Sequence, residues 1–160
     1  MPSILTNPRK NGLTRSVLSV LLIVTNTLAP PVFGADNSVE VDTKGSNTSI
    51  YIDQIGSNTA RVWCGLSNGT YDTHTCSSAT IDIDQDGTGN LAKAYSQYTN
   101  HTGNEYTITQ TGNDNTGYID ADEDNNELSI TQDGDDMYGE IYMSGDDNVY
   151  TISQSGTGNH

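Results

Sequence analysis

Isoleucines recur every eleven residues through the C-terminal half of the chain, at Ile108, Ile119, Ile130, Ile141 and Ile152. Around each of them, apolar and polar residues alternate over five positions. That alternation has the period of a half-buried strand, whereas a helix would place apolar residues three and four apart. Gly, Asn and Asp residues separate the runs, and these residue types tolerate the positive φ of tight turns. The pattern therefore predicts short strands joined by turns.

Successive eleven-residue steps alternate between two kinds, so the repeating unit is twenty-two residues long. The first kind has a large residue two positions before its Ile and Gln two positions after, and the second has Gly before and Ala or Met after. Earlier units repeat the first kind at Ile52 and Ile83 with less regular spacing, because residues 65–78 and 99–103 are inserted. The glutamines of the first kind are Gln54, Gln85, Gln110, Gln132 and Gln154.

Stacking like strands of successive units predicts an all-β fold, a β-solenoid of ten strands in about five two-strand rungs with cross-β stacking. In this arrangement the glutamines form one ladder along the stack. The isoleucines form others, which comprise Ile52, Ile83, Ile108, Ile119, Ile130, Ile141 and Ile152. Across the interior, Gln faces Gly117 or Gly139, which leaves room for its amide. Residues 39–43 and 150–154 would be half-rungs at the two ends, and copies joined head to tail would complete them as an open filament.

The first 34 residues are typical of a secretory signal peptide. Arg9, Lys10 and Arg15 precede the short apolar run Ser16–Val24, and small residues precede a cut after Gly34. The run is too short to span a bilayer, so the remaining chain is predicted not to span a membrane. The domains are then a signal at 1–34 and a repeat domain at 35–160 with an inserted loop at 65–78. An uncleaved amphipathic anchor is the alternative.

Charge and composition narrow the classes of partner. Residues 35–160 keep three of the six cationic and all 21 acidic side chains, a formal charge of −18. Such a charge disfavours nucleic acid and anionic membranes as partners. Leu, Ile and Val are also scarce in this part, which is ordinarily typical of disorder. The regular placement of the isoleucines is the argument against disorder here.

The repeat resembles the curlin repeat of bacterial curli subunits. The resemblance is carried by Asn104–Gln110 with Gly112 and Asn115, and by Asn126–Gln132 with Gly134. It implies a secreted subunit that self-assembles into amyloid fibres on the bacterial surface, for adhesion and biofilm matrix. Other curli subunits and an outer-membrane secretion apparatus are the partners it implies. In that family, inward Gln and Asn ladders drive nucleation and stacking, and by position the five glutamines named above would do so here.

Two further features have competing interpretations. Cys64 and Cys76 bracket the insertion, and in an exported chain an even pair favours a disulfide that closes a surface loop. The acidic residues are expected to cluster in turns. Asp120, Asp122 and Asp124 partly match a Ca²⁺ loop but lack its final Glu, so weak divalent binding is the alternative to a solvated acidic surface. Mutual repulsion predicts slow assembly in low salt at neutral pH, and faster assembly with acid or divalent ions.

No catalytic motif is present, so the chain is predicted not to be an enzyme and to need no cofactor or resident metal. The rival to a fibre subunit is a monomeric secreted β-solenoid that binds Ca²⁺, a glycan or ice through one flat face. A regular outward Thr array would favour ice binding. The residues that flank the isoleucines vary instead, as Thr107 and Thr109 against Asp82 and Asp84 show.

Overall fold

The computed structural model describes residues 20–27, 36–43, 47–63, 75–95, 100–102, 104–121, 127–143, 147 and 149–160. For residues 20–27, 75–77 and 100–102 it describes the backbone. All regular elements in these ranges are β-strands. The long strands are β1 (Val20–Thr27), β3 (Thr48–Arg61), β5 (Thr80–Leu91), β7 (Glu105–Asn113), β8 (Glu127–Asp135) and β9 (Val149–Thr157). The short ones are β2 (Ser38–Glu40), β4 (Thr75–Ser77) and β6 (Asn100–Thr102).

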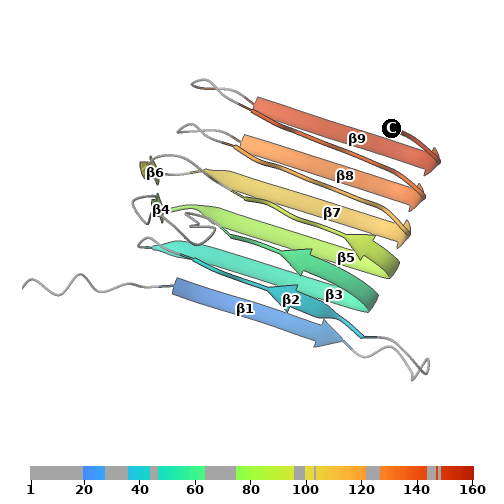
Figure 1. Cartoon of the computed structure of the whole chain (residues 1–160), viewed down its shortest axis with the longest axis horizontal. Helices are drawn as coiled ribbons and strands as arrows, with labels where there is room; N and C mark the ends of the chain where they lie inside the picture. Colours follow the sequence, from blue (N-terminus) through green and yellow to red (C-terminus); the bar gives the residue numbers. More distant parts are fainter. Residues whose placement is uncertain are drawn as a thin grey trace, which may run out of the picture.

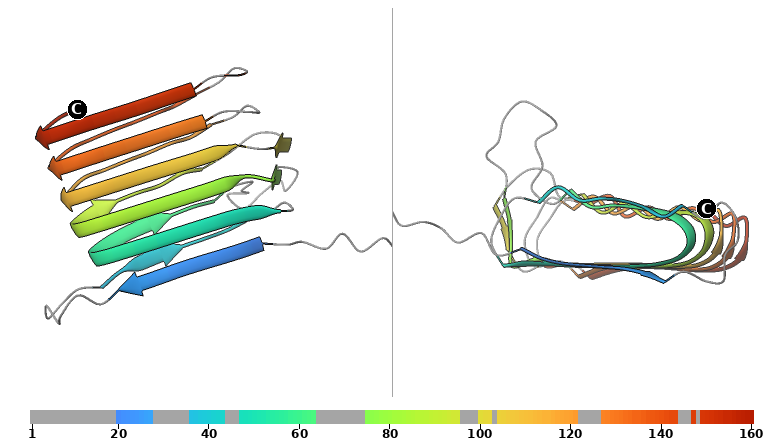
Figure 2. Two further views of the ribbon diagram at one scale, coloured as in Figure 1. Left: turned by 180° about the vertical axis from the view of Figure 1, so that it is seen from behind. Right: turned by 90° about the horizontal axis from the view of Figure 1, so that it is seen from below.

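The long strands stack in the order β1-β3-β5-β7-β8-β9, and each pair is parallel (Figure 1). Seen along the stack, the chain traces a flattened loop with two long sides (Figure 2). β3 follows one side, rounds the end and continues on the other, where β2 pairs with its last three residues. Like strands of successive units therefore lie on one another, and the predicted all-β solenoid is confirmed.

The number of turns is about four, where the sequence predicted about five. Complete turns begin at β3, β5, β7 and β8. β2 and β9 are half-turns at opposite ends of the stack, and counting them together as one rung produced the fifth. They cannot close a turn within one chain, because they lie at opposite ends of the stack.

The second long side of the loop, where the last residues of β3 lie, contains fewer regular strands than the predicted total of ten requires. After β7 and β8, this side is held by the isolated bridges Leu91↔Thr116 and Thr116↔Tyr138. Gly117 N donates to Leu91 O at 2.9 Å, and Gly139 N donates to Thr116 O at 2.8 Å. The segments therefore stack in register without forming continuous ladders of strand hydrogen bonds.

The two interruptions of the repeat meet in space. β4 lies in the insertion at 65–78 and β6 in the one at 99–103, and the two strands pair in parallel as a separate small sheet. The sequence did not predict this pairing. The second interruption thus stacks on the first, so part of each insertion continues the solenoid's stacking.

The core is a narrow apolar column between the two sides. Ile52, Ile83, Ile108, Ile130 and Ile152 occupy one register position on successive strands. The first four are fully buried, whereas Ile152 on the edge strand is partly exposed. Ile119 and Ile141 on the opposite side are also buried in this core. Parallel stacking of identical residues thus builds one continuous column from few aliphatic side chains.

Where the chain rounds the end of the loop, each turn has a glycine that lies directly against the glycine of the next turn. Gly112 has a φ of 108°, and a Cβ there would collide with the carbonyl oxygen of Gly134 on the next turn. Gly56, Gly87 and Gly134 have the same conformation and the same contact with the glycine above. A side chain is excluded at this position by the backbone of the neighbouring turn, beyond the usual cost of positive φ. The close stacking of successive turns therefore requires Gly two residues after Gln.

Candidate functional site

The five glutamines of the first kind form a one-directional chain of side-chain hydrogen bonds through the interior. Gln54 Nε2 donates to Gln85 Oε1 at 2.7 Å. The next three bonds, from Gln85 to Gln110, from Gln110 to Gln132 and from Gln132 to Gln154, are each 2.8 Å long. Each amide therefore donates toward the C-terminal end of the stack and accepts from the N-terminal end.

From Gln85 onward, each amide also donates to a backbone carbonyl on the other side of the loop. Gln110 Nε2 donates to Leu91 O at 3.3 Å, and Gln132 Nε2 donates to Thr116 O at 3.0 Å. A Cβ on Gly117 would lie 3.5 Å from Gln110 Nε2 and 3.0 Å from Ile108 Cγ2. The Gly opposite the Gln thus keeps the two sides close enough for these cross-bonds, so the amides of Gln110 and Gln132 are held at both hydrogens.

The two ends of this ladder are complementary. At the N-terminal end, Gln54 Oε1 is buried and accepts no hydrogen bond. At the other end, Gln154 is partly exposed and donates to Tyr138 O at 2.9 Å. Its second amide hydrogen has no partner among the described residues. One end therefore offers an acceptor and the other a donor.

A second buried ladder, of asparagines at the turn, was not predicted as a site. Asn90 N donates to Asn58 Oδ1 at 3.2 Å, and Asn115 N donates to Asn90 Oδ1 at 3.0 Å. Asn115 Nδ2 also donates to Gly134 O at 2.7 Å. These side chains are at most 2% exposed. The available signal was an Asn four or five residues after each of four glutamines.

Met137 interrupts the asparagine ladder. Its backbone N donates to Asn115 Oδ1 at 3.1 Å, as the ladder requires. Its side chain is buried and offers a thioether, which Asn159 Nδ2 approaches at 3.8 Å from Sδ. A thioether is a weak acceptor, so the turn is less tightly bonded here than between Asn90 and Asn115.

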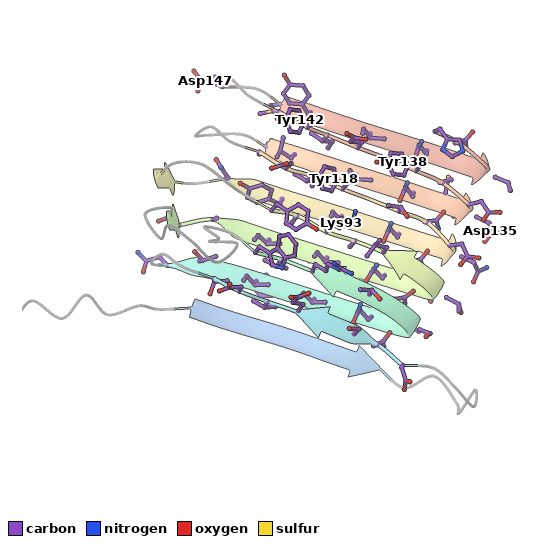
Figure 3. All side chains as sticks on the ribbon, viewed as in Figure 1. Lys93, Tyr118, Asp135, Tyr138, Tyr142 and Asp147 are labelled. Atoms are coloured by element: carbon purple, nitrogen blue, oxygen red, sulfur yellow. The ribbon has the colours of Figure 1, made fainter. Side chains whose placement is uncertain are left out.

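Aromatic rings stack along the outside of the second side. The ring centroids of Trp63 and Tyr95 are 4.0 Å apart, and those of Tyr95 and Tyr118 are 5.5 Å apart. Lys93 Nζ lies 5.1 Å from the centroid of the Tyr118 ring. Lys93, Tyr118 and Tyr142 follow one another up this side of the stack (Figure 3). The repeat pattern did not predict this cluster, since its rings come from positions between the alternating apolar residues.

Two tyrosine hydroxyls on this side donate to carboxylates two residues later. Tyr118 Oη donates to Asp120 Oδ2, and Tyr138 Oη donates to Glu140 Oε2, both at 2.8 Å. Burial, followed by the bond to Asp120, raises the pKa of Tyr118 well above its usual range. The bond to Glu140 is the main reason that the pKa of Tyr138 is raised. Both hydroxyls therefore stay protonated at neutral pH.

The sequence predicted that the acidic residues would cluster in turns, but some of them lie on strands. Asp82 and Asp84 lie on strand β5, where the alternation that buries Ile83 points them outward. Asp120 is only 6% exposed. Burial and the neighbouring carboxylates, Asp53 first, raise the pKa of Asp84. Asp53 is in register with Asp84 on the next turn, so parallel stacking itself brings these like charges together.

Several predicted features fall outside the described residues. Cys64 and the side chain of Cys76 are not described, so their disulfide stays a prediction. The signal at 1–34, of which only the backbone of residues 20–27 is described, also stays a prediction. Asp122 and Asp124 of the partial Ca²⁺ loop are also outside. Among the residues that are described, no group of three His, Cys, Asp or Glu side chains is placed to hold a metal ion. No helix in the same ranges has the length and apolar character to span a membrane.

Comparison with known families places the repeat. The family described as the curlin associated repeat matches residues 102–134 and 123–156. Residues 102–156 are curlin repeats. The matched segments hold β7, β8 and most of β9 with their glutamines, so the curlin repeat coincides with the most regular part of the ladder. Curlin repeats are structural rather than catalytic units. Comparison with the curated proteins and with the solved structures gave no match.

Proposed function

We propose that this curlin-repeat protein is a secreted structural subunit that joins copies of itself head to tail into curli-like amyloid fibres. The fibres would lie on the surface of a bacterium and serve adhesion and biofilm matrix. Other curli subunits and an outer-membrane secretion apparatus would be its partners. The proposal includes removal of the signal at 1–34, after which β3 becomes an edge of the sheet.

The complementary ends of the glutamine ladder carry this proposal. Within the chain, every bond of the ladder runs from Nε2 to the Oε1 of the next turn. A second copy placed with its β9 on the β3 edge would let Gln154 donate to Gln54 Oε1, the ladder's acceptor that has no donor among the described residues. The ladder would then continue across the junction with unchanged chemistry and direction. A buried amide network that extends without an unpaired group favours repeated addition.

The backbone supports the same geometry. β9 lies at the edge of the sheet, and the strand ladder is parallel throughout, so the exposed edge is a template for another parallel strand. The register that places Gln154 on Gln54 also places Ile152 on Ile52, because both strands carry Ile two residues before Gln. The apolar column and the polar ladder would therefore extend together.

Fibre diffraction with electron microscopy tests the proposal on residues 35–160 incubated in moderate salt. Unbranched fibres with reflections near about 4.7–4.8 Å and about 10 Å are expected. A matched pair of variants tests the junction: Gln154→Leu removes the donor at the edge, and Ser153→Ala changes a neighbouring outward position. The first is expected to slow elongation and the second to leave it unchanged. A folded species that stays monomeric for days would refute the fibre subunit and favour the monomeric binding module.

A further inference from the structure

Trp63, Tyr95 and Tyr118 form a continuous row of aromatic rings on the outside of the second side. Each ring comes from a different turn, because Trp63 follows β3, Tyr95 follows β5 and Tyr118 follows β7. The ring centroids are 4.0 Å apart in the first pair and 5.5 Å apart in the second. At such separations aromatic side chains are in direct contact. An electron can therefore pass along the row, because tunnelling between aromatic rings is fast at contact distance.

The middle ring of the row is held firmly in place. Tyr95 is 8% exposed, and its φ of 39° lies in the left-handed region that residues other than Gly seldom adopt. Backbone strain of this kind persists only where the surrounding structure enforces it, and it clusters at functional sites. Arg61 also forms a side-chain hydrogen bond with Tyr95. The ring of Tyr95 is therefore fixed between its two aromatic neighbours.

The last ring of the row has a base bonded to its hydroxyl. Tyr118 Oη donates to Asp120 Oδ2 at 2.8 Å, and Asp120 is only 6% exposed. Burial raises the pKa of Tyr118, so this hydroxyl stays protonated as long as the ring keeps its electrons. Loss of one electron makes a phenol strongly acidic, and its proton then moves to a base that is already hydrogen-bonded to it. Tyr118 is therefore built to lose an electron and a proton together.

The charges beside the rings favour Tyr118 over Tyr95 as the place where a radical comes to rest. The hydroxyl of Tyr95 lies beside the cation of Arg61, which opposes the loss of an electron. Tyr118 lies beside the carboxylate of Asp120, which favours it. Lys93 Nζ, 5.1 Å from the centroid of the Tyr118 ring, acts against the carboxylate (Figure 3). Proton transfer to Asp120 is thus the step that makes oxidation of Tyr118 favourable.

We propose that Trp63, Tyr95 and Tyr118 form a one-electron relay, which reduces an oxidant at Trp63 and leaves the radical on Tyr118. The oxidant is a small inorganic radical that reaches the outside of the second side. It takes one electron from Trp63, which becomes a radical cation. The activity is independent of fibre assembly, because the whole relay belongs to one chain.

The second step restores the tryptophan. An electron passes from Tyr118 through Tyr95 to the radical cation of Trp63. The Oη–H bond of Tyr118 breaks, and its proton bonds to Oδ2 of Asp120. The products are an intact Trp63, a neutral phenoxyl radical on Tyr118 and a protonated Asp120. The relay thus moves an oxidation away from the only tryptophan of the chain.

Pulse radiolysis of the full chain in azide solution tests the relay. At neutral pH the azide radical takes an electron from tryptophan faster than from tyrosine, so Trp63 is oxidised first. The absorption of the tryptophanyl radical is expected to decay while that of a tyrosyl radical grows at the same rate. This rate should not depend on protein concentration, because the transfer occurs within one chain. It should be lower in heavy water, because a proton moves to Asp120.

Three conservative variants separate the parts of the relay, with circular dichroism to show that each is folded. Tyr95→Phe keeps the middle ring but removes its redox group, and it is expected to lose the conversion of tryptophanyl to tyrosyl radical. Asp120→Asn keeps an acceptor for the Tyr118 hydroxyl but removes the base, and it is expected to slow the conversion. Tyr138→Phe is the matched control and should leave the rate unchanged. Tyr138 also donates to a carboxylate, but its ring neighbour among the described residues is His160, at 6.4 Å between centroids.

Two results would overturn the inference. If no tyrosyl radical grows in the wild type, or if Tyr95→Phe converts at the wild-type rate, the three rings do not form a relay. If the rate is the same in Asp120→Asn and in heavy water as in the wild type, Asp120 is not the proton acceptor. Neither result bears on fibre assembly, which is measured separately by fibre diffraction.

Discussion

Gln110 donates its side-chain amide to Oε1 of Gln132 at 2.8 Å, in a polar ladder whose first four members, from Gln54 to Gln132, are buried. The bond joins residues 22 positions apart and lies parallel to the stacking direction. Since each of the three inner glutamines both donates and accepts, the loss of one leaves a donor on one neighbour and an acceptor on the other unpaired. The ladder therefore couples each inner turn of the solenoid to the turns on both sides of it, in one direction along the stack.

Gln110→Leu tests this coupling. It keeps the volume of the side chain but leaves an amide hydrogen of Gln85 and Oε1 of Gln132 buried without partners. We expect the free energy of unfolding to fall by about 2–4 kcal/mol, measured by urea unfolding followed by circular dichroism. Thr109→Val, at the adjacent partly exposed position, is the control and is expected to change stability by less than about 0.5 kcal/mol. Equal effects of the two variants would contradict the ladder's role.

Because the glycines of successive turns lie in contact, adding one methyl group to one of them is expected to lower the free energy of unfolding severely. Gly112→Ala places Cβ against the carbonyl oxygen of Gly134 at a φ of 108°, so the turn must move apart. We expect a loss of more than about 4 kcal/mol or no folding at all. Gly158→Ala is the matched control, because Gly158 has a φ of 67° with open space around its Cβ position. It should lose only about 1–2 kcal/mol from backbone strain, as thermal unfolding of both variants will show.

The asparagine ladder predicts a cost that the repeat pattern does not reveal. Asn115→Met copies the residue found at Met137 and deprives the buried Met137 N–H of its acceptor. We expect the free energy of unfolding to fall by about 1–3 kcal/mol. The same substitution at the exposed Asn113 should cost less than about 0.5 kcal/mol. If denaturant unfolding gives the same midpoint for both, the turn ladder does not stabilise the stack.

The raised pKa of Asp84 predicts that the free energy of unfolding depends on pH. Its folded-state pKa is raised by burial and then by Asp53, so ionisation opposes folding. Wild-type stability should rise as pH falls through this raised pKa, and the gain is complete below the ordinary value of 3.8. Asp84→Asn should therefore be more stable than the wild type at pH 7, by less than about 1 kcal/mol since the group is mostly solvated. The difference should vanish at pH values below 3.8.

Urea midpoints of both proteins at the two pH values measure this effect. Asp133→Asn is the control, because Asp133 has Thr111 and Ser155 rather than carboxylates as its register neighbours. A gain at Asp133 equal to that at Asp84 would show that total charge, and not the stacked pair with Asp53, is responsible. Faster assembly of Asp84→Asn in low salt is expected on the same ground.

The repeat alone determined much of the fold. An Ile and a Gln at fixed places in a 22-residue unit specify a strand, a buried face and a turn. Identical units that stack in parallel must place Ile on Ile and Gln on Gln, because register follows from the shared pattern. The Ile and Gln columns and the solenoid itself could thus be predicted without coordinates.

Tertiary structure decided what depends on contacts between different units. It gave the glutamine ladder its direction and left Gln54 Oε1 unpaired at one end. It placed Asp84 beside Asp53, paired β4 with β6, and laid β1 along β3. None of these follows from one unit's sequence, because each depends on which segment lies next along the stack and on which hydrogen-bonding groups that neighbour leaves free.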